Sequence, residues 1–170
     1  MQVKVSNEGA EPLLLADVKS YLRVDYSDDD TYLTNLIKSV RQKVEEFTGR
    51  ALVVKTIEVW YNYVPEMIYL PYPEHDAIQE VKFNGVVSEG YYKTGLTQFI
   101  IEPAAYVSEL AGNDKGVYVK YTTTGNFPAG IKDEMLKIIS EMYMNRGNTA
   151  TGATELNENA FDNLSQFSLV

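Results

Sequence analysis

The sequence predicts an α+β protein in which a small helical bundle carries an inserted antiparallel β region. Apolar residues recur at steps of three and four in an early and a late segment, and they alternate at a period of two in between. We therefore expect residues 1–51 and 128–147 to form one helical domain. Residues 52–127 are expected to form a β sandwich or open barrel, and residues 148–170 a flexible C-terminal tail.

Two helices are expected near the N-terminus, a short one over residues 13–24 and a long amphipathic one that ends before Gly49. The apolar face of the long helix comprises Leu33, Leu36, Ile37, Val40, Val44 and Phe47. Its opposite face carries Lys38, Arg41, Lys43, Glu45 and Glu46. The acidic turn Asp28, Asp29 and Asp30 is expected to cap the first helical turn, and Gly49 to supply a left-handed stop.

The region from residue 52 to residue 124 is rich in β-branched and aromatic residues. Residues 53–63 alternate clearly, and Asn84-Gly85 is typical of a tight hairpin because both residues tolerate positive φ angles. Five or six short strands are expected. Trp60 and the nearby tyrosines either pack in this region or form an aromatic platform for sugar or protein.

A third helix is predicted after Pro128, with Gly147 as its end. Its apolar stripe comprises Ile131, Met135, Ile138, Ile139 and Met142. The residues that follow contain no Lys or Arg and only scattered apolar side chains. Such a tail does not offset an ordering cost of about 1 to 2 kcal/mol per residue without a partner.

The composition excludes several classes of function. A formal charge of −9 and a pI near 4.6 argue against a protein that grips nucleic-acid phosphates. The chain has no cysteine, so disulfides and thiolate metal sites are excluded. No apolar run approaches the length needed to cross a bilayer, so no membrane partner is expected.

Catalytic signatures are weak, and we expect neither an enzyme nor a cofactor or metal. The chain lacks phosphate-loop, dinucleotide, zinc-hydrolase and hydrolase-elbow patterns. Its one histidine, His75, lies in a proline-rich loop, and the acidic turn lacks the Gly and Glu that a calcium loop requires. Paired carboxylates in the β region leave a glycosidase as a weaker alternative.

Two segments together resemble the head-tail connector (adaptor) proteins of tailed bacteriophages, in their longer members with a β insertion. The first is LLLADVKSYLRVDYSDDDTYLTNLIKSVRQKVEEFTGRAL, residues 13–52, with the endings Lys19, Leu22, Arg23, Val24, Asp25 and Glu45, Thr48, Gly49, Arg50, Ala51, Leu52. The second is VYVKYTTTGNFPAGIKDEMLKIISEMYMNRG, residues 117–147, which is similar to the family's last strand and final helix.

The resemblance implies a structural virion protein located at the head-tail interface and assembled in the host cytoplasm. It implies a ring, commonly of twelve copies, that binds the portal protein and a stopper or tail-completion protein. DNA would pass through the ring without specific binding. The alternative is a non-catalytic β-rich module that binds carbohydrate or protein, which a glycan screen would distinguish.

Two interaction surfaces are hypothesised. The exposed flank of the long helix, with Lys38, Arg41, Lys43, Glu45 and Glu46, is expected to pair with Asp28, Asp29 and Asp30 of the next copy in a ring. The resemblance also implies that the C-terminal segment docks on the portal or a neighbour. This chain ends in SQFSLV, where the family often has a basic ending, and its docking side chains would be Phe161, Leu164, Phe167 and Leu169.

Overall fold

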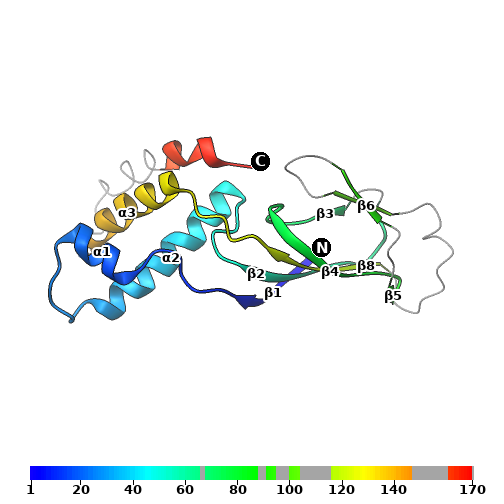
Figure 1. Ribbon diagram of the computed structural model, residues 1–170, viewed down its shortest axis with the longest axis horizontal. Coiled ribbons are helices and arrows are strands. Elements are labelled where there is room, and N and C mark those ends of the chain that lie inside the picture. Colours follow the sequence, from blue (N-terminus) through cyan, green and yellow to red (C-terminus); the bar gives the residue numbers. More distant parts are fainter. Residues whose placement is uncertain (66–67, 88–90, 95–99, 104–115, 147–160, 170) are drawn as a thin grey trace. The chain divides into compact units, whose positions relative to one another are not determined.

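The computed structural model describes residues 1–65, 68–87, 91–94, 100–103, 116–146 and 161–169. For residue 7 and for residues 91–94 and 100–103, it describes the backbone but not the side chains. It confirms the predicted α+β class (Figure 1). The chain forms two compact units. Met1–Ala10 and Val53–Asn126 make the β unit, and Glu11–Leu52 and Phe127–Val170 make the helical unit.

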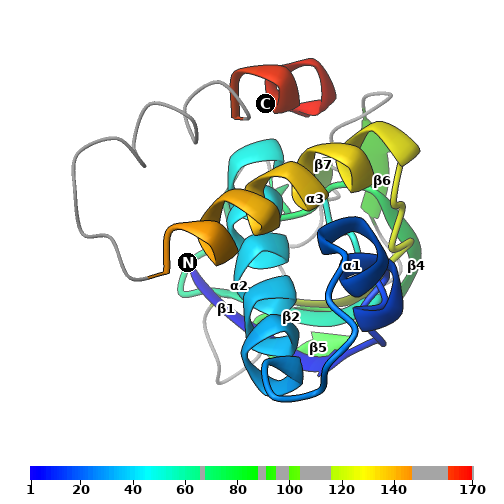
Figure 2. The same cartoon turned by 90° about the vertical axis from the view of Figure 1, so that its left-hand side faces the viewer.

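The helical unit contains the three predicted helices. They are α1 (Leu15–Leu22), α2 (Asp30–Thr48) and α3 (Ala129–Met144), which Figure 2 shows gathered together. Residues 161–164 add one helical turn that continues into the 3-10 turn Ser165–Phe167. The order of two early helices and one late helix is therefore as the periodicity predicted.

The predicted apolar stripe of α2 forms the centre of the helical core. The buried cluster comprises Leu13, Val18, Val24, Leu33, Leu36, Ile37, Val40, Val44, Leu52, Ile131, Met135, Leu136, Ile138, Ile139, Tyr143 and Leu164. Phe47 is the exception, because its side chain remains 43% exposed and its ring lies 5.3 Å from that of Phe161. The long helix is thus a packing axis for the elements around it.

The ends of α2 match the sequence prediction at the C-terminus but not at the N-terminus. Gly49 adopts a left-handed φ of 69° and donates its N–H to the carbonyl of Glu45, as expected. The expected side-chain cap is wrong, since Asp29 occupies the cap position without a side-chain hydrogen bond to the helix. The carboxylates of Asp29 and Asp30 instead bind other side chains of the helical unit.

The C-terminal residues 161–169 differ from the expected flexible tail. Leu164 is fully buried against the helices, and the backbone N–H of Leu169 donates to the carbonyl of Thr48 over 2.9 Å. Arg50 Nε donates to the carbonyl of Phe167 over 2.6 Å. Burial of the apolar side chains offsets the ordering cost that the sequence argument assigned to this segment. The rest of the predicted tail, residues 148–160 and 170, lies outside the described residues.

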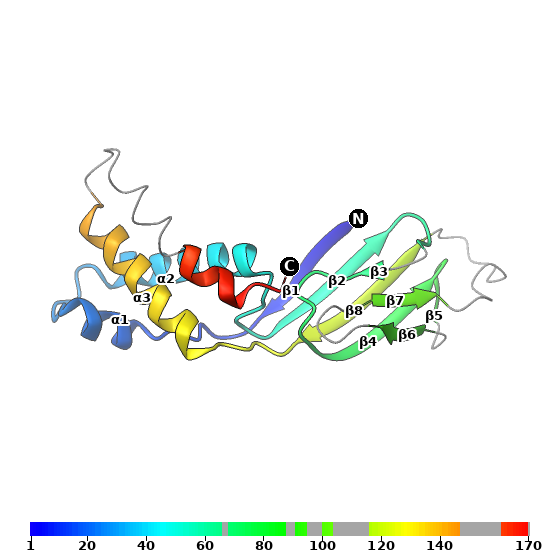
Figure 3. The same cartoon turned by 90° about the horizontal axis from the view of Figure 1, so that it is seen from above.

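The β unit is built on a five-stranded antiparallel sheet in the order β1-β2-β8-β4-β5. Its strands are β1 (Gln2–Glu8), β2 (Lys55–Tyr61), β8 (Val117–Thr123), β4 (His75–Phe83) and β5 (Val86–Val87). Figure 3 shows the first four side by side. The sheet is open and does not close into a barrel.

A second antiparallel sheet has the order β3-β7-β6, with β3 (Ile68–Tyr69), β7 (Ile100–Pro103) and β6 (Tyr91–Thr94). Side chains of β3 join the same core as one face of the larger sheet. That core comprises Ile57, Val59, Ile68, Leu70, Val81, Phe83, Val117, Val119 and Tyr121. The β insertion therefore has a hydrophobic core of its own.

The N-terminal residues fold with the β unit, whereas the sequence argument grouped residues 1–51 with the helices. β1 pairs with β2 from Gln2 opposite Trp60 to Glu8 opposite Lys55, and Gly9 donates its N–H to the carbonyl of Val54 over 2.7 Å. Pairing with a distant strand supplies the support that an isolated N-terminal strand lacks.

The predicted Asn84-Gly85 hairpin is confirmed. Both residues adopt positive φ angles, 49° and 81°, and β4 pairs with β5 on either side of them. The side-chain carbonyl oxygen of Asn84 also accepts the N–H of Gly116 over 2.9 Å. This contact fixes the hairpin against the start of β8.

Candidate functional site

The polar face of α2 divides into an exposed part and a buried part. Lys38, Lys43 and Glu46 are exposed, as the interface hypothesis requires. Arg41 and Glu45 are instead 0% and 1% exposed, so the expectation that they lie on the surface is corrected. The two residues lie one helical turn apart and form an ion pair over 2.6 Å, so each charge is compensated inside the protein.

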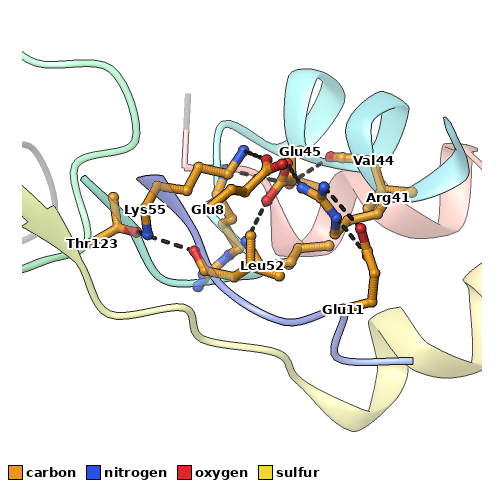
Figure 4. A network of polar contacts seen from close by, with 11 residues as sticks. Glu8, Glu11, Arg41, Val44, Glu45, Leu52, Lys55 and Thr123 are labelled. Atoms are coloured by element: carbon orange, nitrogen blue, oxygen red, sulfur yellow. Dashed lines mark hydrogen bonds and ion pairs between the residues drawn. The ribbon is translucent and has the colours of Figure 1, made fainter. Parts of the chain in front are cut away.

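The guanidinium of Arg41 is held by two carboxylates within the helical unit (Figure 4). Arg41 Nε and Nη2 donate to the two carboxylate oxygens of Glu11 over 2.7 and 3.1 Å, and Nη1 donates to Glu45 Oε2 over 2.6 Å. The other oxygen of Glu45 accepts the N–H of Leu52 over 2.8 Å. The network ties α2 to the segments that precede α1 and follow α2, so its role is structural.

The acidic turn before α2 is bound to α1 and α3. Asp29 Oδ2 accepts the hydroxyl of Tyr143 over 2.5 Å and Nη1 of Arg146 over 2.8 Å. These contacts hold the pKa of Asp29 below its usual value, with the hydrogen bond from Tyr143 as the main cause. Asp30 Oδ1 pairs with Lys19 Nζ over 2.6 Å.

Tyr26 extends this cluster, because its hydroxyl lies 2.9 Å from that of Tyr143. Hydrogen bonding to Asp29 raises the pKa of the Tyr143 hydroxyl. Sequence reasoning did not assign Tyr143 or Arg146 to any site. The sequence feature that could have pointed to these two residues is the Tyr-x-Asn-Arg pattern, residues 143–146, at the end of the last helix. Of the three acidic residues, only Asp28 is exposed, while Asp29 and Asp30 are half-buried.

Three of the four proposed docking side chains, Phe161, Leu164 and Phe167, pack in or against the core of this chain's own helical unit, while Leu169 contacts it through its backbone N–H. Leu164 is fully buried, while Phe161, Phe167 and Leu169 are half-buried. The Phe167 ring lies so close to Gly130 that a Cβ built there would be 2.5 Å from it. The structure brings these residues together in one segment, but it does not present Leu164 to a partner.

An aromatic group lies on the outer face of the five-stranded sheet. The rings of Trp60 and Tyr118 are 5.3 Å apart, and Lys82 Nζ lies 5.2 Å from the Tyr118 ring centre. A hollow of about 300 Å³ adjoins them, lined by Trp60, Tyr61, Lys82, Gly85, Gly116, Val117 and Tyr118. Burial raises the pKa of the Tyr118 hydroxyl. Of the aromatic residues considered from the sequence, Tyr61 and Tyr72 pack against the buried core, whereas Trp60 lies beside Tyr118 on the opposite face of the sheet.

The weaker catalytic candidates are placed as follows. His75 Nδ1 lies 3.0 Å from the carbonyl oxygen of Pro73, and Glu80 pairs with Lys82 over 3.0 Å. Among the described residues, no three His, Asp or Glu side chains form a group suited to a metal ion. In the same part of the chain, no helix is long and apolar enough to cross a membrane.

The fold and these surfaces define an α+β protein with two compact units, a buried ion pair between Arg41 and Glu45, and exposed charged faces. A comparison with family profiles matches residues 13–86 to the phage gp6-like head-tail connector proteins. The predicted resemblance to head-tail connector proteins is thereby confirmed over residues 13–86. The match favours this class over the carbohydrate-binding or protein-binding module.

Solved structures share the fold. A chain from the neck of an empty gene transfer agent (GTA) particle, computed with C6 symmetry, superposes with a TM-score of 0.71 at 16% identity, covering 94% of this chain and 95% of that chain. A chain from the virion of a native GTA particle gives 0.73 at 15% identity, covering 100% and 96%. A chain from the native GTA neck, computed with C12 symmetry, gives 0.67 at 15% identity, covering 94% of each.

These similarities extend over both units of the chain, although the identities are low. A search of curated protein sequences finds no match.

Proposed function

We propose that this connector protein forms a closed ring, of twelve copies, at the head-tail interface of a virion. The family match over residues 13–86 carries the proposal. It is supported by the fold shared with chains of GTA necks that were computed with C6 and C12 symmetry. A ring of identical subunits requires two different, complementary surfaces on each copy.

The ring would join the portal protein on its head side to a stopper or tail-completion protein on its tail side. Its centre would continue the DNA channel. The net charge of −9 suits this role, because an acidic wall repels phosphates and lets DNA pass without specific binding. The work of the protein is then mechanical continuity, without catalysis or a cofactor.

The exposed charges of the helical unit remain the proposed subunit contact. With Arg41 and Glu45 buried and Asp29 and Asp30 paired internally, the contact rests on Asp28 of one copy and on the α2 flank of another. That flank carries Lys38, Lys43 and Glu46. Exposed pairs of this kind contribute about 0 to 1 kcal/mol each, so they select the neighbour more than they hold it.

The C-terminal segment is the proposed portal contact. Because Leu164 is buried in the free subunit, docking through it requires the segment to leave the helical unit. Hydrogen exchange in residues 161–169 should then change when portal protein is added. Unchanged exchange in this segment would remove the docking proposal.

The direct test is negative-stain imaging of the chain mixed with its portal protein. We expect rings seated on portals, and fewer of them with the double charge reversal Lys38→Glu and Lys43→Glu. For the single reversals Lys38→Glu and Lys43→Glu, the charge-matched control is Arg23→Glu, an exposed position outside the proposed contact, which should leave ring formation unchanged. Portals that stay bare with the unaltered chain would contradict the proposal.

A further inference from the structure

The five-stranded sheet ends in two strands whose outer edges suit each other. β1 is the outermost strand on one side of the sheet as described. On the other side, the short β5 covers β4 only at Lys82 and Phe83. The larger part of β4 therefore has no neighbouring strand on that side among the described residues. Figure 3 shows β1 and β4 separated by β2 and β8.

The registers align five rows of residues across the four long strands, and the three rows that start at positions 3, 4 and 5 of β1 are relevant here. The registers align Val3, Val59, Val119 and Val81 in one row, Lys4, Glu58, Lys120 and Glu80 in the next, and Val5, Ile57, Tyr121 and Ile78 in the third. The outer two rows are apolar or aromatic. The middle row alternates positive and negative charge from one strand to the next.

Continuing the sheet from β4 onto another copy's β1 preserves every one of these patterns. Valine would follow Val81 in the first row, and Lys4 of the new copy would follow Glu80 in the second. Opposite charges on neighbouring strands attract, whereas like charges directly opposite destabilise a sheet. Strand direction also agrees, because β1, β2, β8 and β4 alternate, so that a following β1 runs antiparallel to β4.

We infer that in the assembled ring residues 3–5 of β1 in one subunit pair antiparallel with residues 78–81 of β4 in the next, with Lys4 opposite Glu80. The pairing stops before Lys82, where β5 already covers β4. This inference rests on the proposed ring. It names a second interface between copies, through the β unit, beside the contact proposed for α2. The contact is heterologous, since each copy offers one edge at β1 and a different edge at β4, as a closed ring requires.

Exposed side chains of β1 fit this partner. Val3 and Val5 are 43% and 44% exposed although they lie in rows whose other members are mostly buried. Pairing would place Val81 and Ile78 of the adjacent copy beside them. The two apolar rows would then continue across the interface, and the backbone groups of both edges would gain partners.

Bulges limit the pairing to this register. β1 shifts register between Val5 and residue 7, and β4 shifts between Ile78 and Glu80. A bulge twists an edge strand and discourages indiscriminate pairing. Three aligned rows remain, with Gln79 as the extra residue of β4. A sheet that slips by one residue would place Lys4 in an apolar row, which is unfavourable.

The absence of cysteine from the chain permits a direct test by cross-linking. Paired strands hold opposite Cα atoms about 4.5 to 5.5 Å apart, which is within disulfide range. Within one subunit, β1 and β4 are three strand steps apart, or about 14 Å, which a disulfide does not span. A double variant Lys4→Cys, Glu80→Cys can therefore form this bond only between copies.

The experiment uses particles assembled in cells that express the variant chain. After oxidation, we expect a ladder of covalent multimers on a non-reducing gel, because each copy is linked to two neighbours. Lys4→Cys with Lys120→Cys is the matched control. Position 120 lies about 10 Å from position 4 both within a copy and across the proposed contact, so no ladder is expected.

The outcomes separate the two proposals. Particles that contain the chain but give only monomer would overturn the strand pairing and leave the ring intact. Particles assembled with the unaltered chain that lack this polypeptide would remove the proposed function and the pairing with it. A ladder with the control pair as well would also overturn the pairing, because it would show cross-linking without regard to register.

Charge exchange gives an independent readout. Lys4→Glu and Glu80→Lys each place like charges opposite one another, so each should lower the yield of tailed particles. The combined variant restores opposite charges across the proposed contact but leaves like charges opposite Glu58 and Lys120 within each copy, so it should recover part of the yield. Equal yields from all three variants and the unaltered chain would contradict the pairing.

Discussion

Removal of the Arg41 side chain should destabilise the helical unit far more than removal of an exposed charge on the same helix. Arg41 is 0% exposed and makes its ion pairs with Glu11 and with Glu45, which is 1% exposed. Arg41→Ala removes the cation that pairs with the buried carboxylate of Glu45 over 2.6 Å. Breaking a buried ion pair from one side costs about 3 to 5 kcal/mol.

Urea unfolding followed by far-ultraviolet circular dichroism measures this effect. With a denaturant slope of about 2 kcal/mol per molar, the loss corresponds to a midpoint about 2 M lower. Lys38→Ala, on the exposed face of α2, is the control and should change stability by at most about 0.5 kcal/mol.

A double variant tests whether a buried charge without its ion-pair partner causes the loss of stability in Arg41→Ala. Arg41→Met with Glu45→Gln removes both buried charges and keeps an acceptor for Leu52, so it should recover part of the loss. A loss below about 1 kcal/mol for Arg41→Ala, or no recovery in the double variant, would refute the argument that an uncompensated buried charge causes the instability.

Three further predictions concern single positions. Leu164→Ala should lower the free energy of unfolding by about 2 to 5 kcal/mol, because the side chain is fully buried; an unchanged urea midpoint would contradict this. The pKa of Asp29 is lower in the folded chain, so its stabilising contribution is present above its unfolded pKa and is lost as the pH falls. Asp29→Asn should therefore flatten the acid end of a stability profile, and an identical profile would disprove it. Gly116→Ala should destabilise the β unit by more than about 1 kcal/mol, since φ is 122° and a Cβ would lie 1.9 Å from the Tyr61 carbonyl oxygen; Trp60 fluorescence during unfolding tests this.

Local patterns in the sequence predicted the helices well. The stripe from Leu33 to Val44 lies in the core, and Gly49 ends the helix in the left-handed conformation. These features depend on residues three or four apart, which periodicity reports directly. The prediction of the Asn84-Gly85 hairpin was confirmed for a similar reason, because the geometry of the turn is set by two adjacent residues.

Long-range contacts were not predictable in the same way. The burial of Arg41 depends on Glu11, thirty positions earlier, and amphipathic patterning assigns charged residues to the surface. The folded state of residues 161–169 depends on burying Leu164 against helices far away in sequence. The pairing of β1 with β2, more than fifty residues apart, likewise leaves no local signal.

The candidate surfaces also comprise features that local sequence patterns predicted and features that depend on long-range contacts. Exposure of Lys38 and Lys43 followed from the helical period, whereas the internal partners of Asp29 and Asp30 required the folded chain. The edge-to-edge strand contact was not predictable from the sequence, since it depends on the register of four strands.

The central claim is that copies of this chain encircle the DNA channel between head and tail. Cryo-electron microscopy of the neck of purified particles tests it most directly. The account predicts a closed ring of subunits with this α+β fold, seated between the portal and the tail. A neck that contains no density for this fold, in particles free of the polypeptide, would contradict it.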